Sequence, residues 1–108
     1  MAKLAMNIQG VNFNLEASRE YVSRKVAKII DFIPKQFREI AHANVRIERD
    51  GKWFTALVKV QLPGRILFVR EKAASVQSAI DNAERKLRGQ IQRYKTARLL
   101  NLRNAATI

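Results

Sequence analysis

The last quarter of the chain carries a run of basic side chains with no acidic side chain among them. No Asp or Glu follows Glu84, whereas seven cations do: Arg85, Lys86, Arg88, Arg93, Lys95, Arg98 and Arg103. Solvated helix faces usually interleave acids and bases three or four residues apart, because such pairs stabilise the helix and avoid self-repulsion. A basic stretch without acids is instead typical of a surface that binds a polyanion, nucleic acid foremost.

The spacing of these cations indicates a helix that presents several of them to phosphate groups. Lys86 and Arg93 lie seven residues apart and so share one stripe of a helix, with Arg85 and Arg88 on its back and Lys95 on the opposite flank. We predict that this helix contacts RNA phosphates. A solvated face without a ligand is the simpler alternative, and an acidic membrane is the competing polyanion.

A smaller basic pair, Lys25 and Lys28, lies in an earlier segment with helical spacing. Acidic residues dilute that region: Glu16, Glu20, Asp31 and Glu39. If the two helices lie side by side in one layer, this pair widens the basic surface to reach phosphates of more than one strand. We therefore add both lysines to the predicted RNA-binding residues.

Aromatic residues suggest a second way to bind RNA, because single-stranded bases stack on exposed rings of a sheet. The candidates are Trp53, Phe54 and Phe68. Phe54 is in phase with Val58 and is expected in the core, so Trp53, beside a turn, is the only one of the three expected to be exposed. One ring makes a weak stacking platform.

Catalytic chemistry finds little support in this chain. His42 is the only histidine, is expected in a connecting segment, and has no second ligand or nucleophile near it in sequence. The glycine-rich phosphate loops, the HExxH metal motif and the GxSxG nucleophile motif are absent. We expect a protein that is not an enzyme and uses no cofactor, metal or small-molecule substrate.

Composition limits the class of protein. The chain has 108 residues, a formal net charge of +12 and no cysteine. That length fits one domain, for which we expect a core over about residues 4–98 and a flexible basic C-terminal end. Without a signal-like apolar segment or a run of about 20 apolar residues, we expect a cytoplasmic protein with no membrane partner.

The hydrophobic pattern predicts six elements in the order βαβββα. A strand over residues 4–8 is followed by a helix from residue 15, capped by Asn14 and ended by Pro34. Alternating patterns from residue 43 to residue 69 predict three strands, joined by turns at Asp50-Gly51 and at residues 63–64. A long amphipathic helix capped by Ser75 ends the chain.

These elements fit a two-layer α+β fold similar to a double-stranded-RNA-binding domain. We expect an antiparallel four-stranded sheet with both helices packed on one face. The other face would carry Trp53, Thr55 and Leu57, which is more apolar than solvent exposure alone explains.

Several segments resemble one protein family. The last helix begins SVQSAIDNAERKLRGQI over residues 75–91, with Ala79-Ile80-Asp81, Lys86-Leu87 and Gln90 as the shared elements. The opening Asn7-Ile8-x-Gly10 and the helix EASREYVSRKVAKI over residues 16–29 complete the likeness, which spans roughly residues 6–94. These features are similar to ribosome hibernation-promoting factors, also called ribosome-associated inhibitor or sigma-modulation proteins.

The resemblance implies a factor that binds ribosomal RNA of the small subunit in the mRNA and tRNA channel and inhibits translation under stress or in stationary phase. It implies RNA contacts by Lys25, Lys28, Lys86 and Arg93, whereas Arg85, Arg88 and Lys95 are added from charge alone. The chain looks like the short form, which lacks the C-terminal pairing domain of long members, and we expect a monomer.

Departures from the family pattern occur in the last helix. Gln77 stands where tyrosine is usual, Ser75 replaces an acidic cap, and Gly89 stands where a basic residue often occurs. Two other functions stay open: a general double-stranded RNA binder, and a transcription modulator that binds an acidic protein surface.

Overall fold

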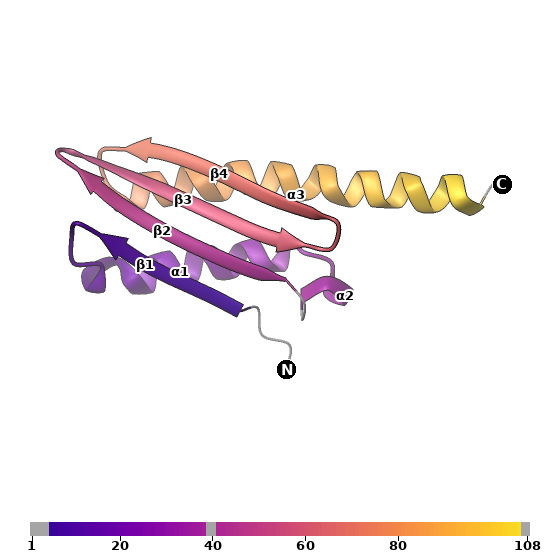
Figure 1. Ribbon diagram of the computed structural model, residues 1–108, viewed down its shortest axis with the longest axis horizontal. Helices are drawn as coiled ribbons and strands as arrows, with labels where there is room; N and C mark the ends of the chain where they lie inside the picture. Colours follow the sequence, from indigo (N-terminus) through magenta and orange to yellow (C-terminus); the bar gives the residue numbers. More distant parts are fainter. Residues whose placement is uncertain (1–4, 39–40, 107–108) are drawn as a thin grey trace.

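A computed structural model describes residues 5–38 and 41–106 and confirms the predicted βαβββα order (Figure 1). A helix of four residues, which the pattern did not indicate, precedes the second strand. The elements are β1 (Ala5–Val11), α1 (Glu16–Asp31), α2 (Lys35–Arg38), β2 (His42–Asp50), β3 (Trp53–Leu62), β4 (Arg65–Ala73) and α3 (Val76–Ala106).

The predicted helix caps are confirmed. Asn14 Oδ1 accepts a hydrogen bond of 3.0 Å from the Glu16 amide, and Ser75 Oγ accepts one of 3.1 Å from the Ser78 amide. Each cap satisfies an amide of the first turn, which has no partner within the helix.

Both predicted hairpins form. In the β3–β4 hairpin Leu62 pairs with Arg65, and Gly64 has φ +77°, as the third position of a type II turn requires. In the β2–β3 hairpin Asp50 pairs with Trp53, so the two-residue turn is Gly51-Lys52, one residue later than predicted.

The sheet has the order β1-β2-β3-β4, and β1 runs parallel to β2. Our expectation of an entirely antiparallel sheet was therefore wrong for this pair, while the β2-β3-β4 meander is antiparallel as predicted. The reason is the crossover: α1 carries the chain back along the sheet, so the next strand starts at the same end as β1.

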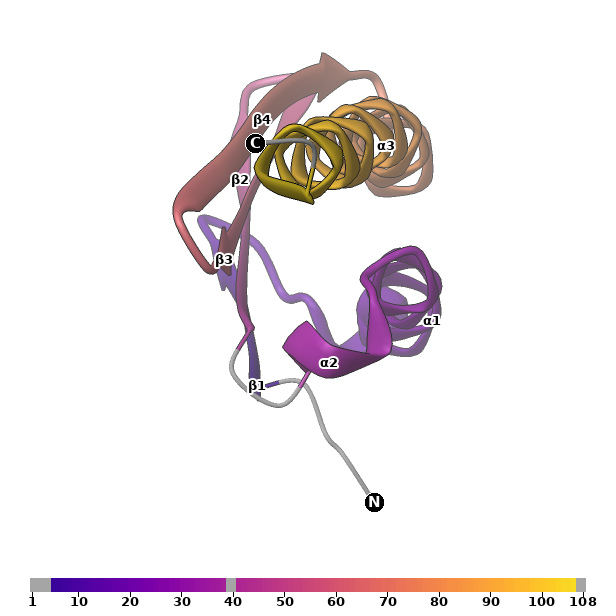
Figure 2. The ribbon, with the colours of Figure 1, turned by 90° about the vertical axis from the view of Figure 1, so that its right-hand side faces the viewer.

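The two long helices cover one face of the sheet and lie side by side, as Figure 2 shows from the end of the molecule. Their apolar stripes and the inner sides of the strands form one core. Its largest fully buried side chains include Val22, Val26, Ile29, Val58, Val60, Ile80, Leu87 and Ile91. The predicted apolar stripes of both helices are confirmed.

The opposite face of the sheet differs from expectation at two positions. Thr55 is buried rather than exposed, because its short side chain lies between the longer side chains of Glu48 and Lys72 on the neighbouring strands. Phe68 is 53% exposed, so Trp53, 48% exposed, is not the only exposed ring. Phe68 points outward because Leu67 and Val69 on either side of it point into the core.

The final helix continues well past the sheet (Figure 1). It is helical as far as Ala106, and the flexibility of this basic end stays a prediction. None of the helices in the described ranges combines the length and apolarity needed to cross a membrane.

Candidate nucleic-acid interface

A groove of about 270 Å³ lies along α1, and three of its four lining residues are cations. Tyr21, Lys25 and Lys28 follow one another at spacings of four and three residues, which places them on one flank of α1, and Arg24 completes the lining. Contacts made by Tyr21 and Lys25 show that this flank faces α3. The groove is therefore basic and lies beside the line where the two helices meet.

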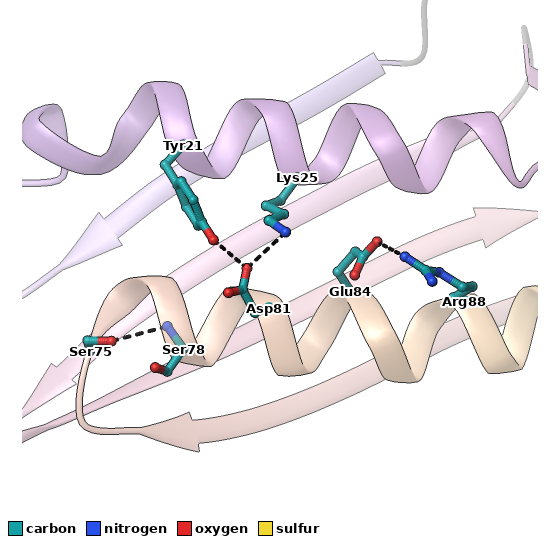
Figure 3. A network of polar contacts seen from close by, with 7 residues as sticks. All are labelled: Tyr21, Lys25, Ser75, Ser78, Asp81, Glu84 and Arg88. Atoms are coloured by element: carbon teal, nitrogen blue, oxygen red, sulfur yellow. Dashed lines mark hydrogen bonds and ion pairs between the residues drawn. The ribbon is translucent and has the colours of Figure 1, made fainter.

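Asp81 on α3 joins the two helices across this line (Figure 3). The Tyr21 hydroxyl donates a hydrogen bond of 2.6 Å to Asp81 Oδ1, and Lys25 Nζ lies 3.2 Å from the same oxygen. Lys25 is thus already paired within the protein, and part of its charge is neutralised.

The pKa values of these three groups move as the contacts require. Partial burial raises the pKa of Asp81, but hydrogen bonds from Tyr21 and Lys25 and the charge of Lys25 outweigh it, so the pKa falls below 3.8. The hydrogen bond to Asp81 raises the pKa of Lys25 and also that of Tyr21. At neutral pH the network therefore holds a carboxylate, an ammonium and a neutral phenol.

A second contact lies about two turns further along α3, between Arg88 and Phe32, the residue that follows α1. Arg88 Nη2 is 2.5 Å from Glu84 Oε1, and the Arg88 guanidinium lies 4.7 Å from the centre of the Phe32 ring (Figure 3 shows the ion pair). The Glu84 side chain is only 7% exposed, so Arg88 neutralises a nearly buried carboxylate. Arg88 therefore contacts Glu84 of its own helix and Phe32, the residue that directly follows α1.

The remaining cations of α1 and α3 near the groove have no carboxylate within ion-pair distance in the described ranges. They are Arg24, Lys28, Arg85 and Lys95, of which the first three are exposed. Lys95 follows Arg88 by seven residues and so lies on the same stripe of α3. These four side chains are the groups that the geometry leaves available to phosphates.

Lys86 and Arg93 lie on the other flank of α3, which faces β4. Lys86 Nζ is 2.5 Å from Glu71 Oε1 of β4, and Gln90 Nε2 donates a hydrogen bond of 3.2 Å to the Phe68 carbonyl. Five residues separate Lys86 from Asp81, a rotation of about 140° around the helix. The expectation that Lys86 and Arg93 share one surface with Lys25 and Lys28 was therefore wrong, and RNA contact by either group stays a prediction.

Sequence reasoning missed Arg24 and Tyr21 as lining residues of the groove. The signal was present in the spacing, since Tyr21 lies four residues before Lys25.

His42 is exposed, but as the first residue of β2 and not in a connecting segment, where we had placed it. In the ranges that the structure describes, no three His, Asp or Glu side chains come together as a metal site would require.

Comparisons with known proteins point to one family. Residues 6–98 match the family model described as sigma 54 modulation protein / S30EA ribosomal protein. A ribosome hibernation promotion factor of Lactococcus lactis subsp. cremoris is 31% identical over 105 residues, which are 94% of this chain and 55% of that protein. The chain thus spans about half the length of this curated relative.

Solved structures share the fold. The N-terminal domain of Thermus thermophilus Protein Y superposes with a TM-score of 0.72 at 29% identity, covering 85% of this chain and 98% of that one. A ribosomal subunit interface protein from Coxiella burnetii gives a TM-score of 0.71 at 18% identity, covering 86% and 99%. The second likeness is one of fold alone.

Proposed function

Because the chain belongs to the sigma 54 modulation protein / S30EA ribosomal protein family, which comprises ribosome-associated hibernation factors and not enzymes, we propose that it silences ribosomes by occupancy. In this proposal it binds small-subunit ribosomal RNA in the mRNA and tRNA channel and blocks translation under stress or in stationary phase. It acts in the cytoplasm as a monomer, without cofactor or substrate.

The unpaired cations around the groove carry this proposal. Arg24 and Lys28 on α1 and Arg85 on α3 are exposed and lack carboxylate partners among the described residues, beside two helices that Asp81 holds in fixed relation. An exposed cation that the fold does not use can exchange its counterions for phosphates, which is the main source of affinity for nucleic acid. Lys95 extends the same stripe along α3.

Lys25 and Arg88 enter the proposal in a different role. Both are predicted RNA contacts, but each already pairs with a carboxylate of α3. The Lys25–Asp81 pair joins α1 to α3 and so fixes the spacing of the free cations, whereas Arg88 pairs within α3 and contacts Phe32 just after α1. Phosphate contacts carry little sequence information, so selectivity would come from the shape of folded ribosomal RNA.

Lys86 and Arg93 form a second basic edge beside β4. A surface with cations on both flanks of α3 suits RNA that wraps around this helix more than RNA that lies flat across both helices. The resemblance to the family implies contacts by both Lys86 and Arg93, and we keep both residues as proposed contacts.

Sedimentation of ribosomes tests the proposal. Wild-type protein should co-sediment with small subunits and whole ribosomes in a sucrose gradient, and a Lys28→Glu, Arg85→Glu variant should stay at the top. A matched Arg49→Glu, Lys52→Glu variant changes the charge equally at the β2–β3 turn and should still co-sediment. Equal co-sedimentation of the groove variant would refute the assignment of the groove.

Two further results would favour the alternatives. Release from ribosomes by arbitrary double-stranded RNA would indicate a general duplex binder. A complex from cell extract that survives nuclease treatment would indicate an acidic protein partner.

A further inference from the structure

No helix in the described part of the chain covers the face of the sheet opposite α1 and α3 (Figure 2). We call it the open sheet face. Cross-strand pairing and alternate burial assign to it Asn7, Gln9, Asn44, Arg46, Glu48, Asp50, Trp53, Thr55, Leu57, Lys59, Gln61, Ile66, Phe68, Arg70 and Lys72. The proposed ribosome contact uses none of them.

Phe68 is the most exposed large ring on this face, and it lies among cations. It is 53% exposed on β4, opposite Lys59 of β3 and two residues from Arg70 on its own strand. Ile66, 59% exposed, lies on its other side. A single exposed apolar residue is ordinary, but an exposed ring between two cations can hold a base and its flanking phosphates together.

The charge distribution divides the open sheet face into two ends. Its acidic residues are Glu48 and Asp50, both at the β2–β3 turn, and Arg46 Nε pairs with Glu48 at 2.9 Å. Around Phe68 the neighbouring strand positions hold Lys59, Arg70 and the neutral amides of Asn44 and Gln61 instead. The Phe68 end is therefore cationic, with amide groups that can donate to and accept from base edges.

Trp53 lies at the other end of the face and is also exposed. Lys72 Nζ is 5.4 Å from the centre of a Trp53 ring, a cation–π contact that takes up part of the indole surface. Trp53 and Phe68 therefore lie at separate positions along β3 and β4. The Phe68 ring has no such cation–π contact among the described residues and is the more available of the two.

We propose that the open sheet face binds single-stranded RNA, with one base stacked on Phe68 and the adjacent phosphates held by Lys59 and Arg70. Stacking on a ring needs an unpaired base, which a duplex does not offer. This surface lies on the opposite side of the sheet from the helix groove, so one molecule can hold folded RNA with its helices and an unpaired strand with its sheet.

A protein partner fits this face less well. Lysine is depleted from the centres of protein interfaces, yet Lys59 lies directly beside Phe68. A second copy of this chain docked with Phe68 against Phe68 would bring Lys59 and Arg70 near their own counterparts, and like charges in an interface oppose binding. RNA neutralises the same cations.

The test measures binding of a labelled oligouridine of about ten nucleotides by anisotropy, with Trp53 fluorescence as a second readout. Trp53 is the only tryptophan and lies on the open sheet face. The background chain carries Lys28→Gln and Arg85→Gln to reduce binding by the helix groove. We expect binding to change Trp53 fluorescence and Phe68→Leu to weaken it by about fivefold to a hundredfold.

Matched variants separate stacking from apolar contact. Phe68→Tyr keeps a ring and should bind as the background chain does, and Ile66→Ala removes exposed apolar surface without a ring and should leave affinity within about twofold. Lys59→Gln, Arg70→Gln should weaken binding and flatten its salt dependence. These positions are exposed or half-buried, so the thermal midpoint of each variant is expected to stay near that of the background chain and reports any loss of fold.

Several results would overturn the proposal. Unchanged affinity of Phe68→Leu would exclude stacking on this ring, and unchanged affinity of both Phe68→Leu and Lys59→Gln, Arg70→Gln would place the RNA elsewhere, whatever the Trp53 fluorescence. Equal losses in Ile66→Ala and Phe68→Leu, or a dimer abolished by either substitution, would indicate a protein interface. Ribosome sedimentation is a separate assay, so failure here leaves the helix groove assignment standing.

Discussion

Asp81 of α3 lies 3.2 Å from the ammonium group of Lys25 on α1, so an ion pair links α3 to the helix whose residues line the basic groove. Tyr21 donates to the same carboxylate oxygen. One acidic side chain of α3 therefore holds two of the four residues that line the groove. Its charge state should decide how firmly the helices are held.

Asp81→Asn should reduce stability at neutral pH and lose this effect in acid. The contacts lower the pKa of Asp81 in the folded protein, so the carboxylate stabilises the fold above its ordinary pKa of 3.8. That contribution disappears as the pH falls through the lower, folded value. Urea unfolding of wild type and variant at neutral pH and below pH 3.8 measures the difference.

The alkaline side supplies the control for this network. Hydrogen bonding to Asp81 raises the pKa of both Lys25 and Tyr21, so their contribution is fully present below their ordinary values of 10.5 and 10.0 and is lost as the pH rises through the higher, folded values. Wild type and Asp81→Asn should converge there too. A stability difference independent of pH would contradict the ion-pair account.

The salt dependence of ribosome binding should show how many phosphate contacts the free cations make, because each contact adds to the slope. Lys28→Gln and Arg85→Gln should each lower the slope of log K against log salt by about one, because each removes one phosphate contact. Lys52→Gln, at the β2–β3 turn, is the matched neutralisation and should leave the slope unchanged. Binding assays at a series of salt concentrations give these slopes.

Glu71→Gln should strengthen RNA binding. The Glu71 carboxylate, 15% exposed, holds Lys86 in an ion pair, and removing its charge frees that ammonium for a phosphate. The Lys86 side chain is 65% exposed, so breaking the pair should change the free energy of unfolding by less than about 1 kcal/mol. A filter-binding titration measures the gain, and it should vanish when Lys86→Gln is added.

Gly89→Ala should stabilise the protein by about 1 kcal/mol, the difference in helix propensity between the two residues. Gly89 lies inside α3, and a Cβ built there has no atom within 4 Å. Thermal unfolding tests the gain. Gly10→Ala is the contrasting variant: its Cβ would lie 3.0 Å from the Leu15 Cβ, so it should lower the midpoint instead.

The periodic elements of this fold could be predicted from sequence because each is specified by local chemistry. Asn14 and Ser75 cap their helices as expected, and Gly64 adopts the positive φ of the predicted turn. The parallel β1–β2 pair was missed because the direction of β2 depends on the end of the sheet to which α1 returns the chain. Alternation of apolar residues does not encode that end. The exposure of Phe68 was missed because its strand lies at the sheet edge, with one neighbouring strand instead of two.

The candidate site was predictable in composition but not in geometry. Charge and the family resemblance identified Lys28, and charge alone identified Arg85; the structure leaves both without carboxylate partners in its described part. Lys25 pairs with Asp81 and Lys86 pairs with Glu71. These ion pairs could not be predicted, because the partners are brought together only by the tertiary structure. Helical spacing placed Lys86 and Arg93 on one stripe correctly but could not say which neighbour that stripe faced.

Parallel pairing of β1 with β2 has a consequence for how the chain folds. The β2-β3-β4 meander closes through two-residue turns, whereas β1 reaches β2 only after the intervening helices have been spanned, and closing a longer loop costs more entropy. We therefore expect the two hairpins to assemble first and β1 to dock last. Amide hydrogen exchange should be faster in β1, at an edge of the sheet, than in the central β3, and the N-terminal strand should be the first to detach on heating.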